Sequence, residues 1–420
     1  MIRRCLLVLS FLLASIAPAL LLGAGLGRAE DRGEGQNQQP IRLLTTIAIP
    51  GTATNPSGKM YVFDISWLDA RTQLYYLADR SNAVIDVIDA KKNVFVRQIP
   101  GKFTGFTGNN NTSGPDGVVS AGRWLFVTDA PSRVVSIDLR TDQIVSDVST
   151  GGADKLRTDE LAFDPQHGLI LAVNNADTPP FATLIKVDKQ TGKLTVGPKI
   201  SFPTATNGAE QPVWDPRTGR FYLSIPEVNG DGGTGTHGAV ARINPTTDPP
   251  TVELLSVDLC QPAGLTLGPR NDLLLGCSVI FDTAGAAWSA SDTKAAAPTQ
   301  IIMDADSGQI DATVQGVGGS DEVWFNSGDG HYYTASRANP LGPVLGVIDA
   351  ERRTLIQLVP TINVAAGIAP NPVHPAGTAH SVAVNPNNNH IFVPLPANNA
   401  FPNCLTGCIA VYGTSKEDDN

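Results

Sequence analysis

The sequence contains no amphipathic helical stretch of any length, whereas turn-forming residues are abundant, with 41 Gly and 31 Pro among 420 residues. That combination is typical of all-β folds with many turns. An excess of basic residues is also missing, because the formal net charge is −10. This charge argues against nucleic acid or an anionic membrane surface as a partner. It is compatible with cation binding, although mild acidity is commoner as a solubility feature.

The motifs of several enzyme classes are absent. There is no H-x-x-x-H helix, G-x-S-x-G elbow, glycine-rich phosphate loop or dinucleotide fingerprint, so a serine-nucleophile mechanism has no support in the sequence. The run CLTGC ends at Cys408 and is followed by Ile409. It is therefore not a c-type haem attachment site, which requires C-x-x-C-H.

The first 29 residues have the pattern of a secretory signal, with Arg3 and Arg4 before the apolar stretch 6–22 and a small-residue site ending at Ala29. We therefore expect a secreted or periplasmic protein that is not inserted in a membrane once the signal is cleaved. An uncleaved anchor is the alternative, since the apolar stretch is long. Residues 30–40 are predicted to form a flexible lead-in, and residues 414–420 a polar tail.

Four cysteines follow the predicted signal. Cys260 and Cys277 flank a hairpin turn near Pro269, which brings them close together, and Cys404 and Cys408 lie within one loop. Neither pair has a histidine at metal-ligand spacing. Since export permits disulfides, we predict two disulfide bonds, one within each pair.

What the chain does contain is a degenerate unit of about fifty residues that occurs seven times. Each copy opens with a polar or acidic residue, continues with an apolar strand and a turn, and reaches a second strand rich in Val, Ile, Leu and Tyr. These second strands read LYYLAD, WLFVTD, LILAVN, FYLSIP, LLLGCS, HYYTAS and HIFVPL. The period and the fixed turn offset predict a seven-bladed β-propeller of four-stranded antiparallel blades.

The seventh copy has only three strands of its own, ending with CIAVYG before the tail. The missing fourth strand is available in residues 41–51, near the start of the predicted mature chain. Pairing that strand into the last blade closes the ring and covers an exposed edge. We therefore predict one propeller domain over residues 41–413, with an insertion in blade five at 281–298. A monomer is expected, although no sequence feature fixes the oligomeric state.

The units LYYLADRSNAVIDVID and LFVTDAPSRVVSIDLRT resemble those of the YVTN-type seven-bladed propellers and their lactonase-like relatives. The likeness extends loosely over residues 41–413. It implies the fold, but it says little about activity, because such propellers include enzymes, metal binders and interaction platforms. A quinone-dependent dehydrogenase of similar shape is disfavoured, since the five Trp do not recur blade by blade.

The residue just before each innermost strand of a propeller lies at the rim of the central channel. Acids occupy five of these seven starts, and a cluster of carboxylates repels itself unless protons or a cation compensate. Oxygen ligands favour Ca²⁺, with Mg²⁺ or a transition metal as alternatives. The alternative is that these acids bond backbone amides at the strand ends, and that water fills the channel. The predicted metal ligands are Asp64, Asp116, Glu160, Glu210 and Asp321.

A gluconolactonase-like enzyme of the senescence-marker family holds a metal at its channel mouth with acidic and Asn ligands, and this chain resembles that arrangement in kind. The resemblance implies metal-assisted hydrolysis of a lactone or related ester, with His380 or a spare carboxylate such as Glu210 as the base. The chain departs from that family in having seven apparent blades rather than six.

Further side chains are candidates for contact with a small organic ligand at the same mouth. His237 lies in the glycine-rich loop NGDGGTGTHG, which is either a cover for the channel or an ordinary exposed loop. His374 precedes His380 by six residues and is expected near it. The predicted ligand-binding set is His237, Asn174, Asn175, Gln261 and Glu322. A non-enzymatic exported binding or interaction module is the alternative function.

Overall fold

The structure is a computed structural model that describes residues 39–153, 155–288, 299–366 and 375–414. The predicted signal at 1–29, most of the lead-in at 30–40, residues 289–298 of the insertion, His374 and residues 415–420 of the tail lie outside the described residues. The predictions made for those segments stay predictions. The described residues form one compact unit.

The described residues form seven four-stranded antiparallel sheets, as predicted. Blade one contains β2 (Ser66–Asp69), β3 (Leu74–Asp79), β4 (Val84–Asp89) and β5 (Val94–Pro100). Blade two contains β6 (Val118–Ala121), β7 (Trp124–Asp129), β8 (Arg133–Asp138) and β9 (Gln143–Ser149). Blade three contains β10 (Leu161–Asp164), β11 (Leu169–Asn174), β12 (Phe181–Val187) and β13 (Leu194–Ser201). Blade four contains β14 (Pro212–Asp215), β15 (Arg220–Ile225), β16 (His237–Asn244) and β17 (Thr251–Asp258).

The remaining blades follow the same order from the channel outward. Blade five contains β18 (Cys260–Leu267), β19 (Asp272–Ile280), β20 (Thr299–Asp304) and β21 (Ile310–Gln315). Blade six contains β22 (Val323–Asn326), β23 (His331–Ser336), β24 (Val344–Asp349) and β25 (Thr354–Pro360). Blade seven contains β26 (Ala383–Asn385), β27 (His390–Leu395), β28 (Cys408–Gly413) and β1 (Arg42–Ala48). One short 3-10 helix, η1 (Asn110–Thr112), is the only helix among the described residues.

Turn chemistry explains why each blade folds back on itself. Asp89, at the end of β4, accepts hydrogen bonds from the backbone N–H groups of Lys91 and Lys92 at 3.0 and 2.9 Å. Asn93 then adopts a left-handed φ of 57° before β5 begins. Asp89 therefore initiates this turn by bonding the backbone that follows it. Asp188 makes the same two contacts in blade three, and Asp304 accepts a hydrogen bond from the N–H of Ser307 in blade five.

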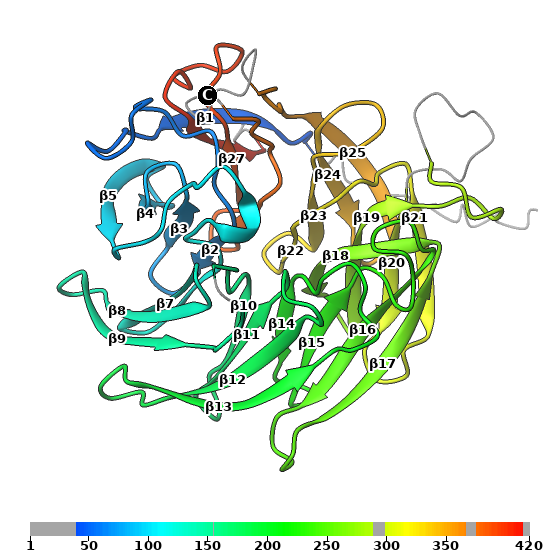
Figure 1. Cartoon of the computed structure of the whole chain (residues 1–420). Coiled ribbons are helices and arrows are strands. Elements are labelled where there is room, and N and C mark those ends of the chain that lie inside the picture. Colours follow the sequence, from blue (N-terminus) through cyan, green and yellow to red (C-terminus); the bar gives the residue numbers. More distant parts are fainter. Residues whose placement is uncertain (1–38, 154, 289–298, 367–374, 415–420) are drawn as a thin grey trace, which may run out of the picture. The chain divides into compact units, whose positions relative to one another are not determined.

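The blades are arranged as a closed ring, in which each innermost strand contacts the innermost strands of the two neighbouring blades (Figure 1). Seven hydrophobic clusters fill the seven blade-to-blade interfaces. Alternation along a strand supplies both neighbours: Tyr75 packs toward blade seven, whereas Tyr76 packs toward blade two. Full burial of a Leu, Ile, Val or Phe side chain in these clusters contributes about 1.5–3 kcal/mol.

The predicted closure by the N-terminal strand is confirmed. β1 pairs antiparallel with β28, from Arg42 opposite Gly413 to Ala48 opposite Cys408. The Gln357 side chain of blade six also holds β1, since it exchanges hydrogen bonds of 2.9 and 2.8 Å with the backbone of Ile41. The outer edge of the last blade is thereby paired.

Both predicted disulfides are present. Cys260–Cys277 joins the neighbouring strands β18 and β19, and Cys404–Cys408 closes a five-residue loop before β28. All four cysteines are buried. Across the described part of the chain, no helix is long and apolar enough to cross a membrane.

Candidate functional site at the channel mouth

Seven equivalent positions surround one end of the central channel, and backbone hydrogen bonds define them. In blades one, two, four and six, the residue after the position donates its N–H to the carbonyl of the corresponding position in the next blade, as Ile65 does to Asp116 at 3.2 Å and Glu322 does to His380 at 3.1 Å. We call these positions the rim stations. They are Asp64, Asp116, Asp159, Glu210, Ala263, Asp321 and His380.

The station of blade five is Ala263. The repeat pattern of the sequence points instead to Gln261, two residues earlier. The N–H of Gln211 bonds to the carbonyl of Ala263 at 3.2 Å. The reason is a shift in the pairing of β18 with β19 on both sides of Pro262. Gln261 is nevertheless buried at the cavity wall, where it accepts a hydrogen bond from Asn207 at 3.2 Å and donates one to the carbonyl of Gly235 at 2.9 Å.

The stations open into a polar cavity of about 580 Å³, which we call the rim cavity. It is lined by six carboxyl groups and three guanidinium groups, together with His380, Gln261 and Asn207. The carboxyl groups belong to Asp64, Asp159, Glu160, Glu210, Asp321 and Glu322, and the guanidinium groups to Arg80, Arg157 and Arg337. Asp116, a seventh acid, is fully buried behind this lining.

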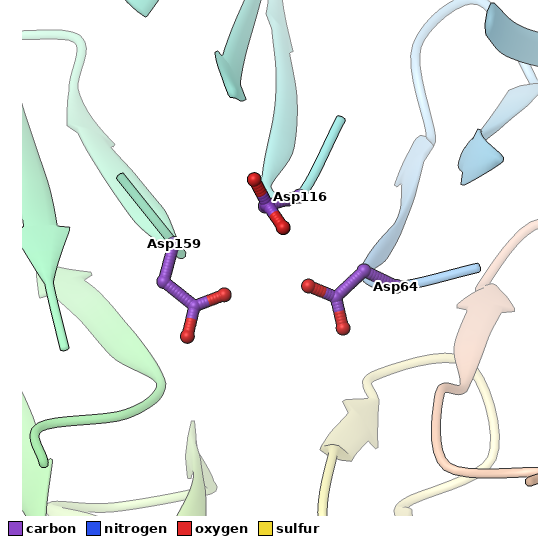
Figure 2. A group of neighbouring side chains, drawn as sticks. All are labelled: Asp64, Asp116 and Asp159. Carbon is purple, nitrogen blue, oxygen red and sulfur yellow. The ribbon is translucent and has the colours of Figure 1, made fainter. Parts of the chain in front are cut away.

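Three of the acids converge from successive blades. Carboxylate oxygens of Asp64, Asp116 and Asp159 lie within 4.8 Å of one another, and Figure 2 shows the three side chains directed toward a common centre. All three are buried. The spacing alone is compatible with a divalent cation held by oxygen ligands.

Two arginines form ion pairs with the carboxylate oxygens of these three aspartates. The Nη2 atom of Arg80 contacts both Asp64 and Asp116, and its Nε atom donates to Asp116 at 3.0 Å. The Nη1 atom of Arg157 lies 3.4 Å from Asp64 and 3.5 Å from Asp116, and its Nη2 atom lies 2.7 Å from Asp159. These guanidinium groups neutralise the charge that a metal would neutralise. A metal ion at this point would therefore compete with both arginines for the same oxygens.

The charges in this cluster do not balance, because three carboxyl groups meet two guanidinium groups. Burial would raise the pKa of Asp64, but Arg80 together with the hydrogen bond from His380 and the charge of Arg157 holds it well below its usual value. Burial raises the pKa of Asp116 and of Asp159 well above the usual value despite the same arginines. Asp64 is therefore the ionised member, and the proton that the cluster retains resides on Asp116 or Asp159.

His380 completes the contacts of Asp64. Its Nε2 atom lies 3.3 Å from Asp64, and its Nδ1 atom lies 2.8 Å from the carbonyl of Thr378. The ring stacks on Phe63 with centroids 5.1 Å apart. The Nδ1 atom also lies 3.0 Å from the Thr378 hydroxyl, so both ring nitrogens lie within hydrogen-bond distance of protein oxygens. The role of His380 as a general base stays a prediction.

Glu210 stands apart from the other acids. It is half-buried and lines the rim cavity, and its carboxyl group forms no hydrogen bond or ion pair with the residues that the structure describes. Burial raises its pKa to about 7, and the nearby charge of Asp321 adds to the rise. Asp321 itself is held by Arg337, whose Nε atom lies 2.6 Å away. A carboxyl group poised near neutrality in a cavity is suited to exchanging protons with a ligand.

Glu160 and Glu322 line the rim cavity, and Gln211 lies behind them, outside its lining; we call these three residues the floor. Burial raises the pKa of both glutamates well above the usual value, and they share a hydrogen bond, so one of them retains a proton. Gln211 donates to Glu322 and accepts from the N–H of Leu265 at 2.6 Å. In the pairs Asp159–Glu160 and Asp321–Glu322, both side chains reach the cavity, although neighbouring residues of a strand point to opposite faces.

Three of the predicted ligand-binding residues lie away from the cavity lining. His237, the first residue of β16, is exposed and pairs with Asp258 of β17 at 2.6 Å. The glycine-rich loop before it is anchored instead by Glu227, which accepts hydrogen bonds from Gly232 and Gly233 at 2.7 and 2.9 Å.

The two asparagines brace other side chains. Asn174 is fully buried and accepts a hydrogen bond from Thr150 at 2.8 Å. Asn175 accepts one from the Nε atom of Arg157 at 3.4 Å, so it positions this guanidinium group.

The arginines are the functional residues that the sequence interpretation missed. Arg80 and Arg337 occupy the same place in their units, one residue after the second strand, where blade three has Asn175. Arg157 lies two residues before the station Asp159. The available signal was the positive residue following LYYLAD and HYYTAS, on the same side of the blade as the acids.

Comparison with known proteins supports the fold alone. No protein-family model matches the chain, and no curated protein matches it either. Among solved structures, the β-propeller domain of Cps50 (Swd1) from Myceliophteria thermophila is similar, with a TM-score of 0.56 and 11% sequence identity. The match covers 90% of this chain and 100% of that domain.

Proposed function

We propose that the rim cavity is a binding site for a small organic molecule that carries positive charge. The supporting observation is the imbalance of six lining carboxyl groups against three guanidinium groups, with Glu210 left without a protein partner among the described residues. A cationic ligand would take the place of the protons that these carboxyl groups retain and use Glu210 as its counter-ion, with Asn207 and Gln261 as polar contacts.

The test is a thermal-shift and calorimetric screen of small primary amines and guanidines, with neutral amides of similar size as controls. A ligand that binds only the folded state raises its stability by RT ln(1 + [L]/Kd). We expect amines but not amides to stabilise the protein, and Glu210→Gln to weaken amine binding by about tenfold. Glu253→Gln removes an exposed acid on β17 and is the matched control. Equal effects of amines and amides would refute the proposal.

A divalent cation, with Ca²⁺ favoured by the all-oxygen donors, is the second species proposed for this cavity. The convergence of Asp64, Asp116 and Asp159 supports it, whereas Arg80 and Arg157 oppose it. Calorimetric titration of the chelator-treated protein with Ca²⁺ decides the matter. Saturable binding that Asp64→Asn abolishes supports the ion, and no heat at millimolar Ca²⁺ removes it from the proposal.

Hydrolysis of a lactone or related ester, as in the lactonase-like propellers that the sequence resembles, is the enzymatic form of the proposal. The pKa of Glu210, about 7, supports it, because this carboxylate would act as the base that activates water. The expected pH profile rises through about pH 7 in the wild type. Hydrolysis that is unchanged in Glu210→Gln would refute this role.

We also propose that the protein is exported. Two buried disulfides support an oxidising compartment, since such bonds are rare in cytosolic proteins. The signal predicted at residues 1–29 gives the route. Fractionation of the expressing cells, followed by sequencing of the mature N-terminus, tests both points together.

A further inference from the structure

A second cavity lies at the opposite end of the channel, and its chemistry is the reverse of that at the rim. Its volume is about 750 Å³, and its wall consists mainly of side chains from the innermost strands of blades one to six. We call it the apolar cavity. It shares only Ile65 and Glu160 with the lining of the rim cavity. The floor formed by Glu160, Glu322 and Gln211 therefore separates the two.

Indole rings dominate the wall of the apolar cavity. Four of the five tryptophans line it, and they come from four different blades: Trp67, Trp124, Trp214 and Trp324. Trp67 and Trp324 are only half-buried, and they tilt against each other with centroids 5.3 Å apart. Leu161, Phe163 and Leu267 complete the apolar surface.

Two of the indole N–H groups are already bonded within the protein. Trp67 donates to Ser120 at 3.1 Å, and Trp124 donates to the carbonyl of Lys189 at 2.9 Å. These two rings therefore offer carbon surface, with no donor left for a ligand. A concave apolar surface of this size is costly to leave in contact with water and has the size of sites that bind drug-like molecules, about 300–1,000 Å³.

One side of this cavity carries positive charge. The Lys189 ammonium group donates only to the carbonyls of Pro165 and Gln166, and no carboxylate of the described residues lies within ion-pair distance of it. The neighbouring Arg123 is different, because Asp138 pairs with it. Lys189 thus supplies an uncompensated charge beside an aromatic wall.

We propose that the apolar cavity binds a planar, apolar ring compound that carries one anionic group. The rings would lie against Trp67 and Trp324, and the anion would face Lys189. Aromatic contact and cation pairing then act at opposite ends of one ligand, which fixes its orientation. This site is independent of the cationic ligand proposed for the rim cavity.

The experiment uses the anionic probe anilinonaphthalene sulfonate and its neutral relative phenylnaphthylamine with the folded protein. We expect saturable binding of one probe molecule with quenching of tryptophan emission. Trp324→Ala should weaken both probes by about tenfold, and Lys189→Gln should weaken the anionic probe severalfold without affecting the neutral one. Trp288→Phe alters the one tryptophan outside the lining and should leave binding unchanged.

A second variant tests the cavity without removing a native side chain contact, so that a loss of probe binding is not due to unfolding. Ala121 is half-buried at the cavity wall, so Ala121→Phe fills the space without removing a native contact. Circular dichroism confirms folding, and we expect this variant to exclude both probes. The proposal is overturned if the probe does not saturate, or if Ala121→Phe and Trp324→Ala bind it as well as the wild type.

Discussion

At the scale of single residues, Arg80 is the most consequential side chain in the rim cavity. It is almost fully buried, with 2% of its surface exposed, and joins Asp64 of its own blade to Asp116 of the next. Removing one partner of a buried ion pair leaves the other charges uncompensated, which typically costs about 3–5 kcal/mol. The stability of the closed ring of blades therefore depends on Arg80 at the junction of blades one and two.

We predict that Arg80→Gln lowers the free energy of unfolding by about 3 kcal/mol at neutral pH, as measured by urea denaturation. The loss should shrink in mild acid, because Asp64 takes up a proton once Arg80 no longer holds its pKa low. Arg71→Gln removes an exposed arginine paired with Asp69 and should change stability by less than about 0.5 kcal/mol. A loss in Arg80→Gln that is equally large at acid pH would contradict this explanation.

The glutamates of the floor give the protein a pH dependence of known sign. The pKa values of Glu160 and Glu322 are raised in the folded state, so that state binds more protons than the unfolded chain at pH values between the ordinary glutamate value of 4.5 and the raised values. The free energy of unfolding must then fall as pH rises through this range. Asp64 has the opposite sign, but its effect is confined to pH below 3.8.

We therefore predict that Glu160→Gln flattens the decline in stability as pH rises above the ordinary glutamate value of 4.5. The amide retains a donor for Glu322 but has no proton to lose. Urea unfolding at several pH values measures the slope, and Glu351→Gln, which alters an exposed acid, should keep the wild-type slope. A slope in Glu160→Gln as steep as that of the wild type would show that the decline originates elsewhere.

At the scale of elements, the sequence predicted the strands and turns well because the forces that make them are local. Alternating apolar residues and an Asp that bonds its own backbone suffice to define a hairpin such as β4–β5. The pairing shift at Pro262 was not predictable in the same way. It depends on how β18 is held against β19 and moves the station to Ala263.

The buried arginines escaped prediction for a related reason. Their partners belong to other blades, as Arg157 shows by contacting Asp64 over 93 residues of sequence. The sequence pattern of one repeat does not indicate which residues of other blades its side chains contact. The acids could be predicted because repetition marked them, whereas the cations appear in only some of the repeats.

The two disulfides should differ in their contribution to stability. The Cys260–Cys277 bond spans 17 residues and the Cys404–Cys408 bond only 4. Chain entropy then predicts losses of about 3 and about 2 kcal/mol when each pair is replaced by alanine. Thermal unfolding of the two double variants measures the order, and a larger loss for Cys404→Ala with Cys408→Ala would contradict the entropic account.

At the scale of the whole molecule, ring closure is the feature that the sequence predicted most completely. Counting strands in the seventh unit was enough, because the fold requires four and the other end of the domain supplies one. The chemistry of the two channel ends required the structure, since side chains from six or more blades converge at each.

We predict that a chain beginning at Gly51, and so lacking β1, loses cooperative unfolding and self-associates. Without β1, β28 presents an unpaired edge, and Ile41 and Ile47 no longer fill their clusters. A chain beginning at Gln39 is the control and should behave as the mature protein does. Size-exclusion chromatography with thermal melts distinguishes them, and a monomeric, cooperative truncated form would refute the role assigned to β1.

Because Arg42 lies directly opposite Gly413 in the β1–β28 pair, the two covalent ends of the propeller are already adjacent. A short peptide linker between them would make a continuous circle of seven blades, which could then be reopened in any turn between blades. In each such circular permutant, the new termini would lie between a chosen pair of blades. The contribution of every blade junction could thus be measured one at a time in the same protein.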